Sequence, residues 1–209
     1  AVMIAQHLMT VEYKPYPASF YHMDKLKSLT RFRDSLVRQR SRQLVDLTNV
    51  LDKVFPEFKP FFKGKFSVTA LYILANYPTP EKVANMNARS YEVLRKLSSG
   101  KFTMIQFAQL KTLAKNTVGA SDDYLLQQME VLLDIYTQLD AKIEEVEAEI
   151  IECIIGIDPP ILSIPGIGAM SAAVILSEFG DFAKYANPSK MLSFAGLEPG
   201  YFQSGQSEH

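Results

Sequence analysis

The chain has 209 residues, of which 47% are hydrophobic and 22% charged, and its formal net charge is −1. This balance excludes a disordered polar chain and allows one or two domains with a buried core. A single cysteine, Cys153, excludes an internal disulfide framework and is typical of a reducing compartment. No signal peptide is expected, and prolines interrupt the longest apolar region, residues 154–176, so we expect no membrane partner.

Charge is unevenly distributed along this nearly neutral chain. Residues 25–42 contain seven lysines and arginines and one acidic residue, Asp34. Residues 140–152 contain six acidic residues and one lysine, Lys142. A local excess of positive charge attracts polyanions even when the whole molecule is neutral, so the basic segment is a candidate for such contacts.

The first 58 residues predict a short helix, a break and a long helix. Residues 1–10 look helical, the prolines of "YKPYP" end that helix, and the uncapped apolar start indicates that the chain is a fragment. A long helix is expected from about Met23 to Phe55, with an apolar stripe along one face. The stripe consists of Leu26, Leu29, Leu36, Leu44, Leu47, Leu51 and Val54.

Four cations share the face opposite that stripe: Lys27, Arg31, Arg38 and Arg42. Two interpretations stay open for this face. It is either the solvated side of a long helix or a surface that contacts the phosphates of a nucleic acid.

Residues 59–120 predict a small insertion of short helices in which no chemical motif is visible. Helix caps punctuate this region. Starts are expected at Thr79-Pro80, near Asn87 and at Thr103 with Gln106, and ends at Gly100 and Gly119.

Residues 122–155 carry apolar side chains spaced alternately by four and three, which predicts a coiled-coil seam. The seam residues are Leu125, Met129, Leu132, Tyr136, Leu139, Ile143, Val146, Ile150 and Cys153. The partner is either the basic helix, antiparallel within the chain, or a second copy in a homo-oligomer. Either way Glu144, Glu145 and Glu149 are expected to complement the arginines.

A glycine turn, Gly166-Ile167-Gly168, stands between an apolar segment and a helix expected from Ala169 to Glu178. This layout is typical of a helix-hairpin-helix element, whose turn amides bind a DNA phosphate without reading sequence. Ile164 and Ile167 are expected to pack the two helices together. The alternative is a plain turn in which the glycines only permit tight packing.

The C-terminal segment predicts one more helix and then a loop. Asn187-Pro188 is expected to start the helix and Gly196 to end it. Ser204 precedes a glycine in the loop, so its hydroxyl is a candidate nucleophile, although it could equally be an ordinary loop serine.

Two motifs together, "IPGIGAMSAAVILSEFGD" and "FAGLEPGYFQSG", resemble the C-terminal half of the Piv-type DEDD transposases and recombinases, the insertion-sequence 110 family with its 116 and 902 groups. "AVMIAQHLM", "LKSLTRFRDSLVRQRSRQL" and "FPEF" are similar to the family's segment after its last catalytic aspartate. The resemblance covers residues 1–58 and 155–205.

This resemblance implies a transposase with a RuvC-like module, whose acidic residues bind Mg²⁺ upstream of this chain, and a C-terminal domain whose serine attacks DNA. Ser204 matches that serine, and no metal ligands are expected in the chain itself. The family's structured guide RNA becomes a second expected partner beside DNA, with Lys27, Arg31, Arg38 and Arg42 as candidate contacts. Alone, the fragment is expected to bind nucleic acid but not to cut DNA.

The expected fold is therefore all-α, with long antiparallel helices forming a coiled coil and a C-terminal transposase domain that contains the helix-hairpin-helix. The expected segments are the end of the RuvC-like module (1–20), the basic helix (21–58), the insertion (59–120), the coiled-coil helix (121–155) and the transposase domain (156–209). Two other hypotheses remain: a non-catalytic helix-hairpin-helix protein of DNA repair or replication, and a purely structural coiled-coil adaptor.

Overall fold

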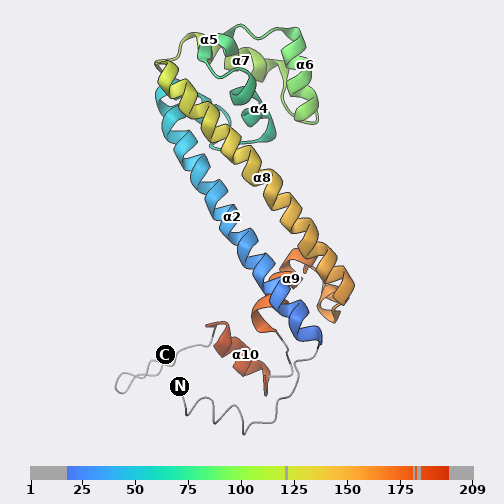
Figure 1. Cartoon of the computed structure of the whole chain (residues 1–209). Coiled ribbons are helices and arrows are strands. Elements are labelled where there is room, and N and C mark those ends of the chain that lie inside the picture. The colour runs from blue at the N-terminus through green and yellow to red at the C-terminus, as the bar shows by residue number, and fades with distance from the viewer. Residues whose placement is uncertain (1–17, 121, 181, 183–184, 198–209) are drawn as a thin grey trace, which may run out of the picture. The chain divides into compact units, whose positions relative to one another are not determined.

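A computed structural model describes residues 18–120, 122–180, 182 and 185–197. Every regular element in these ranges is helical, so the predicted all-α class is confirmed (Figure 1). The chain divides into two compact units. Unit 1 combines residues 1–32 with 146–209, and unit 2 is the continuous segment 33–145.

The first long helix, α2, runs from Ala18 to Val54 and ends where Pro56 would interrupt its hydrogen bonding. Its predicted apolar stripe is confirmed. Leu26, Leu36, Leu47, Leu51 and Val54 are buried, and Leu29 and Leu44 are partly buried. The 3.6-residue period of a helix places these side chains on one face, which packs inward.

Unit 2 continues with five short helices: α3 (Phe58–Phe61), α4 (Val68–Asn76), α5 (Pro80–Ala84), α6 (Ala88–Leu97) and α7 (Met104–Lys115). Their apolar faces form one core with the end of α2 and the start of α8. The most deeply buried members are Phe58, Ile73, Met86, Leu94 and Leu110.

Side-chain caps start three of these helices as the sequence predicts. Thr79 accepts a hydrogen bond from the amide of Lys82, and Asn87 accepts one from Ser90. Thr103 and Gln106 form the complete capping box expected of them. Each cap satisfies amides that have no partner within their own helix.

The predicted end of α7 at Gly119 is wrong. The helix ends at Lys115, and Gly119 instead lies against the last turn of α2. A Cβ at Gly119 would come within 2.3 Å of the carbonyl oxygen of Val54, so only glycine fits there. The next amide, Ala120, donates to the carbonyl of Lys53 across 2.9 Å.

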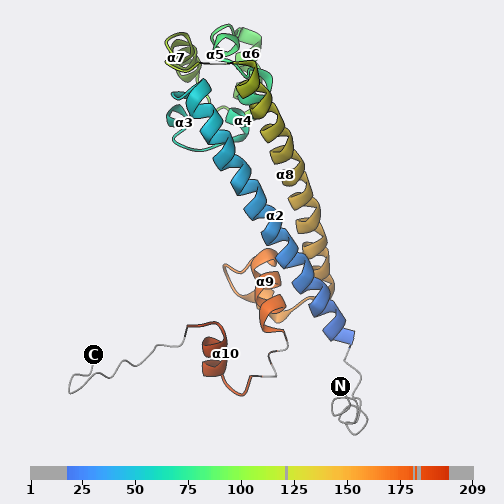
Figure 2. The ribbon, with the colours of Figure 1, turned by 60° about the vertical axis from the view of Figure 1, so that its left-hand side comes forward.

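The second long helix, α8, extends from Asp123 to Ile157. In unit 2 it lies antiparallel beside α2, as Figures 1 and 2 both show, and the ion pair between Arg40 and Asp140 joins the two helices. Of the two predicted partners for α8, the structure therefore contains the basic helix α2 of the same chain. Asp140 provides the acidic contact instead of the expected Glu144, Glu145 and Glu149, and Glu145 pairs with Lys142 of its own helix.

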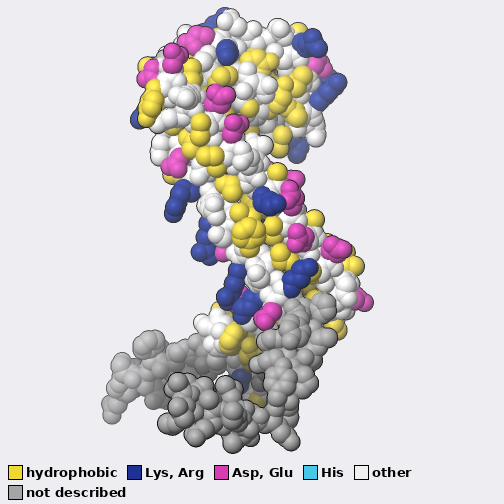
Figure 3. Space-filling view, in the orientation of Figure 1, with side chains coloured by type: hydrophobic (Ala, Val, Ile, Leu, Met, Phe, Trp, Pro, Cys, Tyr) yellow, Lys and Arg dark blue, Asp and Glu magenta, His cyan; other side chains and the backbone are white. Residues whose placement is uncertain are grey.

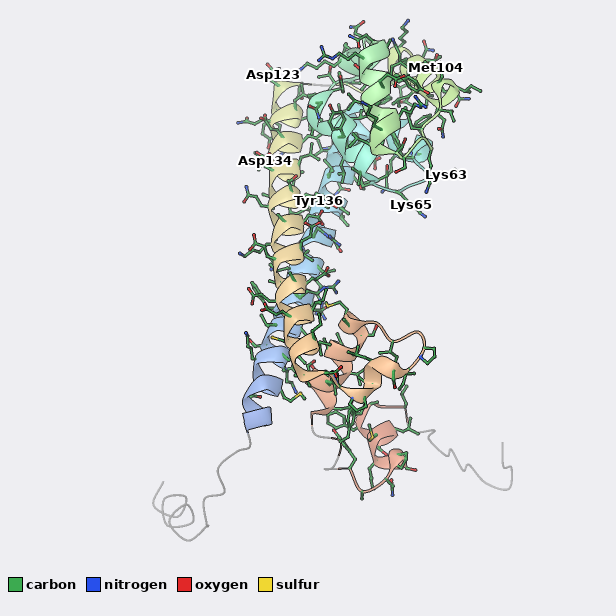
Figure 4. The ribbon with its side chains drawn as sticks, turned by 90° about the vertical axis from the view of Figure 1, so that its right-hand side faces the viewer. Lys63, Lys65, Met104, Asp123, Asp134 and Tyr136 are labelled. Carbon is green, nitrogen blue, oxygen red and sulfur yellow. The ribbon has the colours of Figure 1, made fainter. Side chains whose placement is uncertain are left out.

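The predicted seam of α8 faces inward over most of its length. Met129, Ile143, Val146 and Ile150 are buried within the single chain. Leu125, Leu132, Tyr136, Leu139 and Cys153 are partly buried. Burial, followed by the charge of Asp140, raises the pKa of Tyr136, which lies on α8 in unit 2 (Figure 4).

Unit 1 contains the last turns of α8, a 3₁₀ turn η1 (Pro160–Ser163), helix α9 (Ala169–Phe179) and helix α10 (Pro188–Phe194). The predicted cap of α10 is confirmed, since Asn187 accepts a hydrogen bond from the amide of Lys190. Ring contacts connect α9 to α10, with the centroids of Phe179 and Phe194 5.5 Å apart. Within the described ranges, none of the helices combines the length and the apolar character needed to cross a bilayer.

Candidate nucleic-acid interface

A buried pair of hydroxyl groups joins α2 to α9 in unit 1. The hydroxyl of Thr30 has two acceptors at 3.1 Å: the hydroxyl oxygen of Ser177, 147 positions away, and the carbonyl oxygen of Lys27 in its own helix. Ser177 in turn donates to the carbonyl of Val174. Both side chains are almost fully buried, at 6% and 3% exposure. A hydrogen bond depends on distance and direction, so this pair favours one register between the two helices.

A charged contact at the surface continues the same junction. The guanidinium of Arg31 binds both carboxylate oxygens of Glu178, with Nε–Oε1 and Nη2–Oε2 distances of 3.0 Å. Lys27 adds a third contact at 3.4 Å. The hydrogen bond from Arg31 is the main cause that lowers the pKa of Glu178, and the same bond raises the pKa of Arg31.

The four cations proposed to contact phosphates therefore have different surroundings. Lys27 and Arg31 are bound to Glu178, and Arg38 pairs with Asp34 of its own helix at 2.6 Å. Arg42 is exposed, and no carboxylate partner is found for it among the described residues. A carboxylate competes with phosphate for the same guanidinium donors, so of the four Arg42 is the most available to nucleic acid.

Glu178 is a residue of the junction that sequence reasoning missed. The residue stands inside the motif "IPGIGAMSAAVILSEFGD", but nothing in the spacing pairs it with the basic helix 147 positions earlier. One feature of the sequence could have indicated a polar contact here: Glu178 follows a small polar residue, Ser177, at the end of a mostly apolar helix.

The predicted glycine hairpin occupies the start of α9. Gly166 adopts a φ of +91°, a conformation that favours glycine, and the amide of Ile167 closes a turn onto the carbonyl of Ile164 at 3.1 Å. Gly168 is the N-cap of α9 and gives it no side-chain hydrogen bond. Both glycines are exposed, so no side chain of the turn covers the backbone just before the first-turn amides of α9.

One part of the hairpin prediction is wrong. Ile164, expected to pack the hairpin helices together, is 50% exposed, while Ile167 is only partly buried. The reason is that a short 3₁₀ turn, η1, leads into the hairpin and places Ile164 in the exposed turn. Ala172, Ala173 and Leu176 of α9 make the buried packing instead.

The candidate nucleophile, Ser204, lies outside the described residues. Within the described ranges, no group of three or more His, Cys, Asp or Glu side chains comes together as a metal site would require. The family resemblance places the Mg²⁺ ligands upstream of this chain, and the expectation of Mg²⁺ there stays a prediction.

Comparison with protein families matches both ends of the chain. Residues 158–209 match the model described as Transposase IS116/IS110/IS902 family, and residues 1–56 match a transposase model of the IS110 DEDD type. The chain belongs to the IS110 family of transposases. No curated protein matches it.

The junction lies between the two segments of this IS110-family chain that match. Thr30 and Arg31 belong to the first matched segment, and Ser177 and Glu178 belong to the second. The hairpin is part of the second segment as well. The two transposase segments, separated by residues 57–157, are therefore brought together in unit 1 by direct side-chain contacts.

We expect Glu178→Gln to lower the melting temperature at pH 7 by removing the ion pair with Arg31. The lowered pKa of Glu178 means that its contribution is present above the ordinary value of about 4.3 and is lost as the pH falls through the folded value. The difference between wild type and variant should therefore shrink between pH 5 and pH 3, as measured by thermal unfolding monitored by circular dichroism. Glu144→Gln, on the exposed side of α8, is the control for the loss of one charge. A difference that stays the same down to pH 3 would contradict the assignment.

Proposed function

We propose that this chain is the part of an IS110-type DNA recombinase that binds nucleic acid and carries the serine nucleophile. The observation behind the proposal is that both family-matched segments meet in unit 1, where the second one presents an open glycine hairpin. Such an enzyme acts on cellular DNA, so the proposed location is the bacterial cytoplasm.

We propose that the hairpin Gly166-Ile167-Gly168 binds a phosphate of the DNA backbone. The first amides of an α-helix have no partner in the helix, and its dipole favours negative charge at this end. Gly168 adds no side chain in front of these amides, and a Cβ there would meet nothing within 4 Å. The amides are thus accessible to a phosphate, and a contact of this kind carries no sequence information.

The hairpin is tested by Ser171→Glu, in the first turn of α9, where the side chain is exposed. A negative charge here stabilises the helix through its dipole but repels a phosphate. We therefore expect an unchanged or slightly higher melting temperature together with about a tenfold loss of affinity for a DNA duplex. Fluorescence anisotropy at low salt measures the affinity, and thermal unfolding measures the stability.

Ser171→Gln is the matched control, because it has nearly the same shape without the charge. It should keep the affinity of the wild type. Equal affinities for Ser171→Glu and Ser171→Gln would rule out a phosphate at this end of α9. The result would then favour a plain turn that only allows tight packing.

For the chemical step we propose Ser204. Its hydroxyl oxygen attacks the phosphorus of the scissile phosphodiester, its proton passes to a base, and the bond from phosphorus to the leaving deoxyribose oxygen breaks. The DNA strand is left attached as a phosphoserine, and the released deoxyribose oxygen takes up a proton and becomes a hydroxyl group. Mg²⁺, which the resemblance assigns to the acidic residues of the RuvC-like module, remains part of the proposal for the whole transposase.

Ser204→Ala should abolish both strand transfer and the covalent protein–DNA adduct in a transposition assay with the intact element. DNA binding should persist, because only the nucleophile is removed. Ser207→Ala, three positions away in the same segment, is the control and should remain active. Full activity of Ser204→Ala would instead favour the non-catalytic helix-hairpin-helix protein of repair or replication.

We also propose that a structured guide RNA is bound, with Arg42 as the most available of the four candidate cations. Lys27, Arg31 and Arg38 could join such a contact only by exchanging a carboxylate for a phosphate. A chain that contacts phosphates loses affinity steeply with salt, whereas the coiled-coil adaptor of the third hypothesis would bind nucleic acid weakly at any salt concentration.

A homo-oligomer through α8 stays a prediction. The seam residues are buried within the chain, so a second copy would have to use another face of the helix. In unit 2, exposed apolar side chains at Tyr124, Val131 and Ile135 offer such a face.

A further inference from the structure

The insertion, which lies between the two matched segments, carries a large excess of positive charge. Residues 59–120 contain ten lysines and arginines and two acidic residues, Glu81 and Glu92. Some of these cations have structural partners: Arg95 pairs with Glu92, and Lys59 donates to Thr48. Others, including Lys63, Lys65 and Lys101, are exposed, and no ion pair is found for them within the described ranges.

A groove with an aromatic floor opens among these cations. Its volume is about 440 Å³, and it lies between the loop after α3, the start of α4, the end of α6 and the start of α7. Phe61, Phe62 and Phe102 line it, and the rings of Phe62 and Phe102 are stacked with an interplanar angle of 11°. Such a volume is in the range of pockets that bind small ligands or single ligand groups.

The groove is lined by exposed apolar side chains and by two lysines. Val68 is 66% exposed and Leu97 is 39% exposed, and both line the groove. Lys63 and Lys101 also line it, and none of the described lining residues is acidic. A groove that was only a packing defect would not be expected to combine exposed apolar side chains with charged side chains that are all positive.

Two lysines near the groove lie away from acidic residues of α8. In Figure 4, Lys63 and Lys65 extend from the loop after α3 on the side of unit 2 away from Asp123 and Asp134 of α8. In Figure 3, Lys and Arg side chains stand along the right-hand edge of the insertion, together with an acidic side chain and beside hydrophobic surface. A polyanion that approaches the groove itself meets Lys63 and Lys101 beside the apolar side chains of Val68 and Leu97.

We propose that this groove binds an unpaired DNA strand, with a base against the aromatic floor and the flanking phosphates at Lys63 and Lys101. Aromatic side chains bind bases by stacking, and this contact needs bases that are not already stacked in a duplex. Lysines at the edge provide the electrostatic contribution, which does not depend on sequence. DNA is the partner that the transposase family supports. The proposal goes beyond the hairpin and Ser204, because residues 59–120 lie outside both matched segments.

The test compares the full chain with the double variant Lys63→Glu/Lys101→Glu, using a labelled 20-nucleotide oligothymidine strand in fluorescence anisotropy. Both lysines are exposed, so the fold should be retained, and a circular dichroism melt checks it. We expect at least a tenfold loss of affinity for the single strand. Lys63→Gln/Lys101→Gln should reduce the slope of log affinity against log salt by about 1.4, because each phosphate of a single strand that a lysine no longer neutralises lowers the slope by about 0.7.

Two controls separate the groove from general electrostatics. Arg89→Glu changes an exposed cation of the same unit that does not line the groove, and it should alter the affinity less than twofold. Val68→Asp, on the apolar wall, should weaken single-strand binding more than duplex binding. The first position of a helix such as α4 accepts an acidic residue, so this variant should fold.

Several results would overturn the proposal. These are an unchanged affinity in the double variant, an equal loss for single strand and duplex, and an equal loss for Arg89→Glu. Much tighter binding of oligouridine than of oligothymidine, or of an acidic peptide than of either strand, would assign the groove to RNA or to a protein instead. Ser171→Glu tests the hairpin separately, so the two proposals can fail independently.

Discussion

The contact between α2 and α9 is the interaction on which the arrangement of unit 1 depends. Two polar contacts lie side by side at this junction. One is the buried pair of hydroxyls, Thr30 and Ser177, and the other is the bidentate ion pair at the surface between Arg31 and Glu178. Apolar packing alone allows two helices to slide past each other, because its energy follows buried area and has little directional character. Directional hydrogen bonds at a buried position remove that freedom. The two family-matched segments thereby form one unit although residues 57–157 separate them.

This contact also changes how the basic helix is understood. A row of cations on one face of a helix has the same pattern whether it binds phosphates or carboxylates of its own chain. Here three of the four predicted positions have carboxylate partners, while the exposed cations of the insertion, such as Lys63 and Lys101, have none within the described ranges. Of these positions, the positive charge most available to nucleic acid therefore lies in unit 2, at Arg42 and at the exposed lysines of the insertion.

Local features of the fold could be predicted from the sequence, because they depend on neighbouring residues. The leucine stripe of α2 and the caps at Thr79, Asn87 and Thr103 follow from helix periodicity and from unpaired amides. Contacts between distant segments could not be predicted. Glu178 as the partner of Arg31, the approach of Gly119 to Val54 and the exposure of Ile164 each depend on how separate helices pack. The groove of the insertion is a further case, since its aromatic floor and its lysines come from two separate stretches of the sequence, residues 61–63 and 101–102.

A double-mutant cycle on Thr30→Val and Ser177→Ala tests most directly whether the junction holds the two transposase segments together. Unfolding by urea gives the free energies of the wild type, the two single variants and the double variant. If the hydroxyls bond across α2 and α9, the two substitutions should be coupled by about 1 kcal/mol, the usual net value of a hydrogen bond. Effects that add to within about 0.3 kcal/mol would show that the two side chains do not interact, and would contradict the central claim.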